Sequence, residues 1–473
     1  MRRITVLLFV VLISTTVVAP AATVEPAVRS AGADGVLVRA AAADIHDIAY
    51  RHGLEVVRAV RSAPDADGSR LYLLRGPAWR DAREVSREVL DLSPEAFNAE
   101  PALLASIPET SGAAVLDPSH QAVLTALDAT WDATFGTQTA WSGYVDQPAV
   151  GIIDLEPAGT GAGVTVAVVD TGVDPDHPVL APSLVPGYDF VADVAGEASE
   201  WSDLLDHSTM VILQGAPQQL SGDETAVSLN HSTMVILQGD EAGAVDPDLV
   251  PPAFGHGTMV AGIVHRAAPG AAIMPLRAFT ADGTGNLADI IDAVYYAVAH
   301  GADVINMSFS MTGFSSELAL AVHYATVNGV VCVAAAGNDG AVNRPYYPAS
   351  FGSAIGVAAT DLDDSVASFS NVGWGLSMLA APGEYAFTTY PGGGWAIAAG
   401  TSFATPWVVG AGALTLETEP SLQPLGVMGA LSNAAPVNGW KRIFITFGRL
   451  DVDDALAAVG SQGAGAQPVS GGG

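Results

Sequence analysis

The sequence predicts an α/β protein, in which a layered domain with a mainly parallel central sheet follows a small α+β domain of the split βαβ type. After residue 163, apolar runs of strand length alternate with helical segments, a pattern typical of parallel strands joined by crossovers. Before residue 110, shorter strand-like and helix-like segments alternate within about 70 residues. With 473 residues, of which 49% are hydrophobic and 14% charged, the chain can bury real cores.

Residues 1–22 have the pattern of an export signal. Arg2 and Arg3 precede an apolar run at 4–18, which ends in Ala19-Pro20-Ala21, a small-x-small pattern expected of a signal-peptidase site. The run is shorter than a comfortable membrane span, which disfavours the alternative of an uncleaved anchor. We expect an exported protein, secreted or periplasmic, with no membrane attachment after removal of the signal.

Residues 23–110 are predicted to form the small α+β domain. Its strands are expected at 36–39, 55–60 and 71–75, and its helices at 45–52 and 79–90. A final strand around 103–107 would complete the split βαβ arrangement. Residues 111–160, with several prolines and glycines, are predicted to be a connector and the start of the next domain.

Residues 161–459 are predicted to form the layered domain, with parallel strands at 164–169, 273–278, 304–307, 330–335 and 354–357. Ile290, Val294 and Val298 repeat every four residues and predict a helix, with Gly301 as its stop signal. An insertion at about 195–250 contains the nine residues 207–215 and an identical copy at 231–239, which suggests a hairpin of strands. Residues 460–473 are rich in glycine and are predicted to be a flexible tail.

The net charge of −32 is concentrated in the layered domain. Residues 1–110 hold 12 of the 18 basic residues and 14 of the 50 acids, so the small domain is nearly neutral. The acidic remainder argues against nucleic-acid binding, because no basic surface is available to contact phosphates. The single cysteine, Cys332, excludes an intramolecular disulfide and is expected to be a core residue in its apolar strand.

Four polar residues lie at strand ends or helix starts of the predicted sheet. Asp170 ends the strand at 164–169, and Asn338 follows the strand at 330–335, directly after Gly337. His256 lies between two glycines at the start of a helical segment. Ser402 begins another helical segment, with Pro406 tolerated in its first turn. Because active sites gather beyond the carboxyl ends of parallel strands, we expect these four side chains to meet there.

Each motif taken alone has another interpretation. Asp170-Thr-Gly also fits an aspartic protease, but that enzyme needs two such carboxylates and the sequence has one Asp-Thr-Gly. Ser402 alone is most often a helix cap, and Asn338 alone a turn residue. The glycine-rich stretch 159–163 precedes its strand, whereas a nucleotide-binding turn follows one. The acids at 174–176 and 361–364, with His177, lack EF-hand spacing and are expected in turns.

Three other histidines are weaker candidates for the base than His256. His207 and His231 lie in the β-branched repeats, where a solvent-facing histidine is expected. His265 lies about 180° around the helix from His256 and cannot share its face.

Together the motifs resemble those of the subtilisin-like serine proteases. The matching segments are Val168-Val-Asp-Thr-Gly-Val173, Gly255-His-Gly-Thr-Met-Val-Ala-Gly262, Ala334-Ala-Ala-Gly-Asn338 and Gly400-Thr-Ser-Phe-Ala-Thr-Pro406, within about 160–460. The resemblance implies a subtilisin-like fold in which Ser402 is the nucleophile, His256 the general base and Asp170 the residue that orients the imidazole. Asn338 and the N–H of Ser402 would bind the oxyanion.

The same resemblance implies a substrate cleft lined by Ser308, Ser310, Gly337 and Tyr346. Ser310 replaces a common glycine, and Tyr346 falls where a glycine often lines the primary specificity pocket, so we expect a preference for small P1 side chains. The chemistry would need no cofactor. Structural calcium has no clear motif, because Val179 stands where many members have a calcium-binding Asp.

Residues 23–110 lie where this family keeps a propeptide that assists folding and inhibits the enzyme. The chain is therefore interpreted as a secreted serine endopeptidase, made as a self-processing zymogen, that acts on proteins or peptides. The alternative is a surface or adhesion protein with a functional repeat insertion and a vestigial protease domain, against which the intact Asp, His, Asn and Ser argue. The charge difference predicts that electrostatic attraction speeds association of the propeptide with the acidic domain.

Overall fold

The computed structural model describes residues 35–61, 68–107, 133–135, 138–155, 159–196, 198–203, 234–237 and 251–464. The large sheet consists of β8 (Thr165–Asp170), β9 (Gly187–Asp189), β10 (Val194–Gly196), β12 (Ala272–Arg277), β14 (Val304–Met307), β15 (Val331–Ala335), β16 (Ile355–Thr360), β17 (Leu379–Pro382) and β20 (Gly448–Arg449). The strand order of this nine-stranded sheet is β10-β9-β12-β8-β14-β15-β16-β17-β20. Strands β10 and β9 are antiparallel and all other neighbours are parallel, which confirms the predicted mainly parallel sheet.

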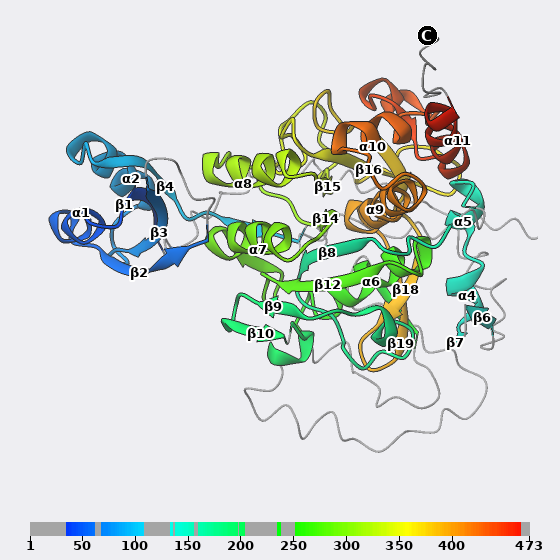
Figure 1. The fold of residues 1–473 in the computed structure, drawn as a ribbon, viewed down its shortest axis with the longest axis horizontal. Helices are drawn as coiled ribbons and strands as arrows, with labels where there is room; N and C mark the ends of the chain where they lie inside the picture. The colour runs from blue at the N-terminus through cyan, green and yellow to red at the C-terminus, as the bar shows by residue number, and fades with distance from the viewer. Residues whose placement is uncertain are drawn as a thin grey trace, which may run out of the picture.

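Helices cover both faces of this sheet (Figure 1). One face carries α7 (Leu287–Ala299) and α8 (Ser316–Val327), and the other carries α6 (His256–Ala267), α9 (Thr401–Thr418), α10 (Pro424–Leu431) and α11 (Val452–Ala464). In β8, Val166 and Val168 lie in the core formed with α6 and α9, whereas Ala167 and Val169 lie in the core formed with α7 and α8. Because both faces are buried, the parallel strands are continuous apolar runs, as the sequence indicated.

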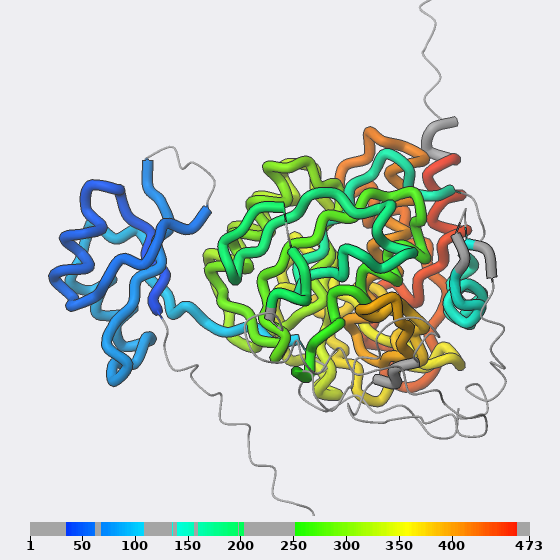
Figure 2. The backbone as a smooth tube through the Cα atoms, turned by 90° about the horizontal axis from the view of Figure 1, so that it is seen from below, coloured from blue at the N-terminus to red at the C-terminus, as the bar shows by residue number. Residues whose placement is uncertain are grey.

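The N-terminal domain has a sheet of its own and lies beside α7 and α8 (Figure 1, Figure 2). It consists of β1 (Val36–Ala41), α1 (Ile45–His52), β2 (Glu55–Val60), β3 (Ser69–Arg75), α2 (Ala82–Leu92) and β4 (Ala96–Pro101). The strand order β2-β3-β1-β4, with antiparallel neighbours, is the split βαβ arrangement that the sequence predicted. Val38, Ile48, Leu74 and Val85 belong to its own core, whereas Leu37 and Leu73 face the core under α7 and α8.

The strand that completes this domain is β4, and the prediction of a completing strand at 103–107 is wrong. Strand β4 was missed because its side chains show no apolar alternation, with Phe97 exposed and Asn98 and Glu100 polar. Residues Leu104–Ser106 form β5, which pairs with β13 (Thr284–Asn286) of the layered domain. Helix α2 begins at Ala82 instead of residue 79, because the Asp81 side chain accepts the N–H groups of Arg83 and Glu84 as an N-cap.

The described part of the predicted connector belongs to the layered domain. It forms β6 (Ala133–Phe135), β7 (Gln138–Ala140), α4 (Ser142–Val145) and α5 (Pro148–Ile152). Trp141 and Tyr144 pack in a satellite core with Phe387 and Trp395. Three short 3-10 helices complete the described helices: η3 (Ala181–Ser183), η4 (Glu200–Asp203) and η7 (Trp440–Phe444).

The second copy of the repeat provides β11 (Met234–Leu237), which confirms a strand there. Its partner is β19 (Gly394–Ala398), which also pairs with β18 (Ala386–Tyr390). The first copy, with His207, and also His231 lie outside the described residues, as does the predicted signal at 1–22. Helix α11 continues to Ala464, into the segment predicted to be a flexible tail. Among the described residues, none of the helices has the length and apolar character needed to cross a membrane.

Candidate active site

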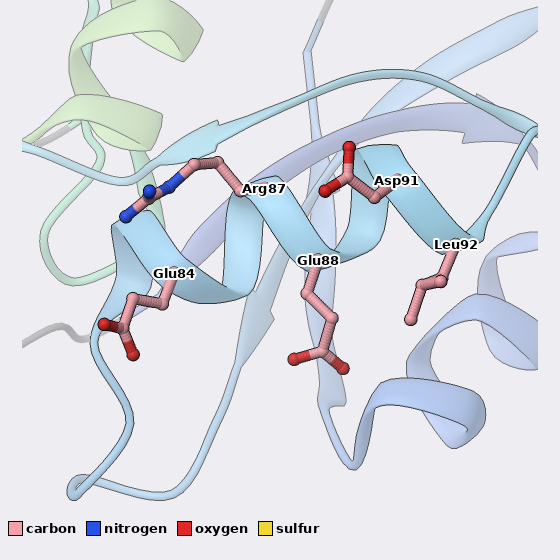
Figure 3. Close-up of a pocket in the computed structure, with 5 residues that line it drawn as sticks. All are labelled: Glu84, Arg87, Glu88, Asp91 and Leu92. Atoms are coloured by element: carbon pink, nitrogen blue, oxygen red, sulfur yellow. The ribbon is translucent and has the colours of Figure 1, made fainter.

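A surface pocket on helix α2 of the N-terminal domain contains none of the residues that the sequence singled out (Figure 3). Its lining residues all belong to that one helix: Glu84, Arg87, Glu88, Asp91 and Leu92. Glu88 contacts Arg80, and its Oε1 lies 2.9 Å from Nδ1 of His52 in helix α1. These contacts join the two helices, so we interpret this cluster as structural.

Asp170 and His256 are brought together in the layered domain. Asp170 is the last residue of β8 and His256 the first of α6, and both side chains are buried. Nδ1 of His256 lies 2.8 Å from Oδ1 of Asp170. A carboxylate at this distance favours the tautomer that carries its proton on Nδ1, so that Nε2 is the basic nitrogen. The start of α6 can approach the turn after β8 closely because residue 257 is glycine: a Cβ there would lie 2.0 Å from the carbonyl oxygen of Gly172.

Ser402 is the second residue of α9, which packs beside α6. The centroid of the His256 ring lies 5.4 Å from that of Phe403, the next residue. The hydroxyl of Ser402 donates to the carbonyl oxygen of Ser308 at 2.9 Å, and the hydroxyl of Ser308 donates to the carbonyl oxygen of Ser402 at 2.9 Å. The second bond replaces a helical one, because Pro406 has no N–H to give to the carbonyl four residues earlier. Pro406 therefore lies inside the helix, not in its first turn as expected.

Asn338 lies at the end of β15 and is oriented by Thr401. The N–H and the hydroxyl of Thr401 both donate to Oδ1 of Asn338, at 2.9 and 2.8 Å. Because its carbonyl oxygen is bound in this way, the other end of the side chain is the N–H donor. The N–H of Gly337 donates to Oγ1 of Thr401 at 3.0 Å, so the start of α9 and the loop after β15 are joined next to Ser402.

Three of the predicted cleft residues converge on one another. A Cβ at Gly337 would lie 3.4 Å from both Oγ of Ser310 and a ring carbon of Tyr346. Gly337 has a φ of 95°, a left-handed conformation that favours glycine. Burial raises the pKa of the Tyr346 hydroxyl to about 12, and the negative charge of Asp339 acts in the same direction.

An extended segment of the N-terminal region pairs with the backbone beside Ser308. Strand β5 is antiparallel to β13 on one edge. On the other edge, the N–H of Ser106 donates to the carbonyl oxygen of Ser310 at 3.1 Å, and the N–H of Ser310 donates to that of Ser106 at 3.0 Å. The N–H of Ile107 donates to the carbonyl oxygen of Gly283 at 3.0 Å. Residues 104–107 therefore lie between β13 and the backbone at Ser310, and they pair with both.

The N-terminal domain also contacts α7 and α8 through ion pairs. Arg39 pairs with Glu317 in helix α8, and Arg58 pairs with Asp289 and Asp292 in helix α7. Burial raises the pKa of Asp289 to about 6, although the positive charge of Arg58 opposes this. The arginine-rich domain thus meets acids of the layered domain directly.

Two residues to which no sequence motif assigned a role, Asn371 and Glu200, also support this site. Oδ1 of Asn371 accepts the N–H groups of Asp339 and Ala341 at 3.0 and 2.7 Å, and its Nδ2 donates to the carbonyl oxygen of Ala336 at 3.0 Å, which shapes the loop that carries Asn338. The buried Glu200 contacts Thr171, which follows Asp170, and Thr258, which lies two residues after His256. Asn371 ends the segment Ser368-Phe-Ser-Asn371, which also resembles the subtilisin-like proteases, whereas nothing in the sequence distinguishes Glu200 among 50 acids.

The acid clusters noted in the sequence are turns, as predicted. Asp174 accepts hydrogen bonds from the N–H groups of Asp176 and Gly392, at 3.1 and 2.8 Å, and from the indole of Trp201 at 3.1 Å. Asp361 likewise accepts the N–H groups of Asp363 and Ser365. In the described ranges, no group of three or more His, Cys, Asp or Glu side chains is placed to hold a metal ion.

Comparison with known proteins gives the family. The model of the subtilase family matches residues 161–461. Thermitase of Thermoactinomyces vulgaris is 34% identical over 275 residues, 58% of this chain and 82% of thermitase. A thermophilic serine proteinase of Bacillus sp. (strain AK1) is 36% identical over 253 residues, 54% of this chain and 52% of that protein.

A solved structure shows the same fold. The crystal structure of fervidolysin from Fervidobacterium pennivorans, described as a keratinolytic enzyme related to subtilisin, matches with a TM-score of 0.61 and 23% identity. The match covers 90% of this chain and 61% of fervidolysin. With the family model and thermitase, these findings identify the layered domain, and the chain belongs to the subtilase family of serine endopeptidases.

Proposed function

We propose that this chain is a secreted, self-processing zymogen of a serine endopeptidase, which hydrolyses peptide bonds in protein substrates through an acyl-enzyme on Ser402. The observation that carries the chemistry is the buried contact of 2.8 Å between Asp170 and His256 beside the start of α9. Nε2 of His256 takes the hydroxyl proton as Ser402 attacks the substrate carbonyl carbon, and later gives it to the leaving amine. Asp170 holds the imidazole in the required tautomer and stabilises the imidazolium.

The oxyanion of the tetrahedral intermediate binds to the side-chain N–H of Asn338 and the backbone N–H of Ser402. The two hydrogen bonds from Thr401 to Oδ1 of Asn338 support this role, because they fix which end of the amide is the donor. The N–H of Ser402 lies in the first turn of α9, and the N-terminus of a helix favours a negatively charged ligand. In the related enzyme subtilisin, loss of one such donor costs about 2.7–4 kcal/mol of barrier. All these groups belong to the protein, so the reaction needs no cofactor.

The backbone pairing of residues 104–107 supports inhibition by the N-terminal domain. These residues use the N–H and carbonyl groups of Ser310 and the carbonyl of Gly283 that an extended peptide substrate would use. A substrate cannot pair with the same groups until this segment leaves. The domain is thus an intramolecular inhibitor, and cleavage of the chain downstream of it starts activation.

The pocket for the P1 side chain is shortened by Tyr346. The ring of Tyr346 is buried beside Gly337 and Ser310. A glycine at position 346 would leave the space of this ring open. Small P1 residues are therefore the expected substrates.

Labelling with a serine-directed fluorophosphonate tests the proposal. The wild-type protein is expected to be labelled and to release its N-terminal domain, and Ser402→Ala is expected to lose both properties. Cleavage of purified Ser402→Ala at the same junction would refute self-processing. A wild-type protein that is neither labelled nor able to cleave a protein substrate would instead favour the surface-protein alternative. The N-terminal residue of the exported protein tests removal of the signal at 1–22.

A further inference from the structure

Glu200 joins the turn after β8, which follows Asp170, to the first turn of α6, which begins with His256. It is the first residue of η4 and is 1% exposed. Its Oε1 accepts hydrogen bonds from the hydroxyl of Thr171 at 2.9 Å and from the N–H of Thr258 at 2.8 Å. Its Oε2 accepts the hydroxyl of Thr258 at 3.0 Å. One carboxyl group thus binds both the residue after Asp170 and the third residue of helix α6.

Two further hydrogen bonds link Thr171, which Glu200 binds, to the Asp170–His256 pair. The N–H of Thr171 donates to Oδ1 of Asp170 at 2.8 Å, the same oxygen that contacts His256. The N–H of Gly257 donates to Oγ1 of Thr171 at 3.0 Å. Glu200 can reach this position because residue 172 is glycine: a Cβ there would lie 2.9 Å from the backbone nitrogen of Glu200.

We propose that Glu200 is a positioning residue of the peptidase, whose carboxyl group clamps the turn after β8 to the first turn of α6 and thereby holds Asp170 against His256. This inference rests on the roles proposed above for Asp170 and His256. The rate of the catalysed step depends steeply on the placement of the catalytic groups, and a displacement of 1 Å can lower this rate about 100-fold. The backbone groups that bind the extended segment belong to residues 283–286 and to Ser310, which Glu200 does not contact in any described hydrogen bond.

The chemical state of Glu200 determines the best substitution for a test. Burial raises its pKa to about 8; the hydrogen bonds from Thr258 and Thr171 oppose this, and the charge of Asp170 adds to it. Tyr390 is also near, because the charge of Glu200 contributes to its raised pKa. Glutamine has the same shape: its Oε1 can accept the two hydrogen bonds that Oε1 of Glu200 accepts, and its side-chain N–H can donate to the hydroxyl oxygen of Thr258.

The test compares Glu200→Ala with Glu200→Gln in the mature enzyme at pH 7, with active sites titrated by fluorophosphonate. We expect Glu200→Ala to lower kcat at least ~10-fold per titrated site, with KM changed less than about twofold. Glu200→Gln should restore kcat to within about threefold of wild type. A purely structural role would lower the number of titrated sites and leave kcat per site unchanged, which would overturn the inference, as would a change in KM alone.

The matched control is Glu417, which also accepts three hydrogen bonds that hold a loop to a helix: from the N–H and hydroxyl of Thr160 and the N–H of Gly161. Glu417→Ala should lower the melting temperature without lowering kcat per site. If Glu200→Ala does not fold, Thr171→Val removes one end of the clamp at nearly constant shape and should lower kcat, and Thr171→Ser should restore it. Ser402→Ala separates the two proposals: activity there refutes the proposed function, whereas unchanged kcat in both Glu200→Ala and Thr171→Val refutes the clamp alone.

Discussion

Replacing Ser106 by proline tests whether backbone pairing of the N-terminal segment closes the active site. The N–H of Ser106 donates to the carbonyl oxygen of Ser310 at 3.1 Å, and proline has no N–H. The rest of the pairing tolerates the change, because Ala105 before it is already in an extended strand, the conformation that a following proline requires. The substitution therefore removes a single donor from the pairing and leaves Ser106's carbonyl in place as an acceptor.

The size of the effect follows from the burial of the acceptor. Ser310 is 6% exposed, so its carbonyl oxygen loses its partner without gaining full contact with water. An unsatisfied buried acceptor costs about 1–3 kcal/mol. Because about 1.4 kcal/mol corresponds to a tenfold change in a binding constant, this loss weakens binding of the segment about 5- to 150-fold.

The assay measures the initial rate at which fluorophosphonate labels the intact chain. The intact chain appears as the full-length band and is thus distinguished from the processed chain. Ser106→Pro should label faster by the factor above, because the active site is open for a larger share of the time. Ser106→Ala is the control: its side chain is exposed and its N–H remains, so the rate should match wild type. Equal labelling rates for Ser106→Pro and wild type would show that the segment does not close the site in solution.

Four further predictions concern the support of Ser402, specificity, pH and salt. Ser308→Ala should lower the free energy of unfolding by about 1–3 kcal/mol, because the carbonyl of Ser402 loses its substitute donor. In a Pro406→Ala background, which restores a helical N–H, urea unfolding should show a smaller loss; an equal loss would contradict the argument. Tyr346→Gly should shift the ratio of kcat/KM between Phe and Ala at P1 by at least ~10-fold towards Phe in a peptide library, and an unchanged profile would refute the short pocket. Burial lowers the pKa of His265 from 6.5 to about 4. Between pH 6.5 and about 4 the unfolded chain therefore binds more protons than the folded chain. The free energy of unfolding should fall by about 3 kcal/mol as the pH drops through this range. In His265→Gln, the urea midpoint should lose this dependence on pH. Raised salt should speed labelling of the intact chain by screening the partly exposed pair of Arg58 with Asp289 in α7, and indifference to salt would mean that the charge split has no role in inhibition.

Much of the fold was predictable because its elements depend on local patterns. The parallel strands are buried on both faces and appear as apolar runs, and helix α7 shows its buried stripe in Ile290 and Val294. Strand β4 was missed because it shows no such pattern, with Phe97 exposed and Ala99 buried among polar neighbours. Segment 104–106 was assigned to the wrong sheet, because an isolated strand does not specify its partner.

The candidate site divides in the same way. The sequence alone predicted the placement of four candidate residues at strand ends or helix starts, and the structure places them there: Asp170, His256, Asn338 and Ser402. Tertiary structure alone brings Glu200 to Thr171, 29 residues away, and to Thr258, 58 residues away. It also decided that residues 104–107 lie beside Ser310. Such contacts depend on which strands become neighbours in the sheet, and no local pattern of residues records that order.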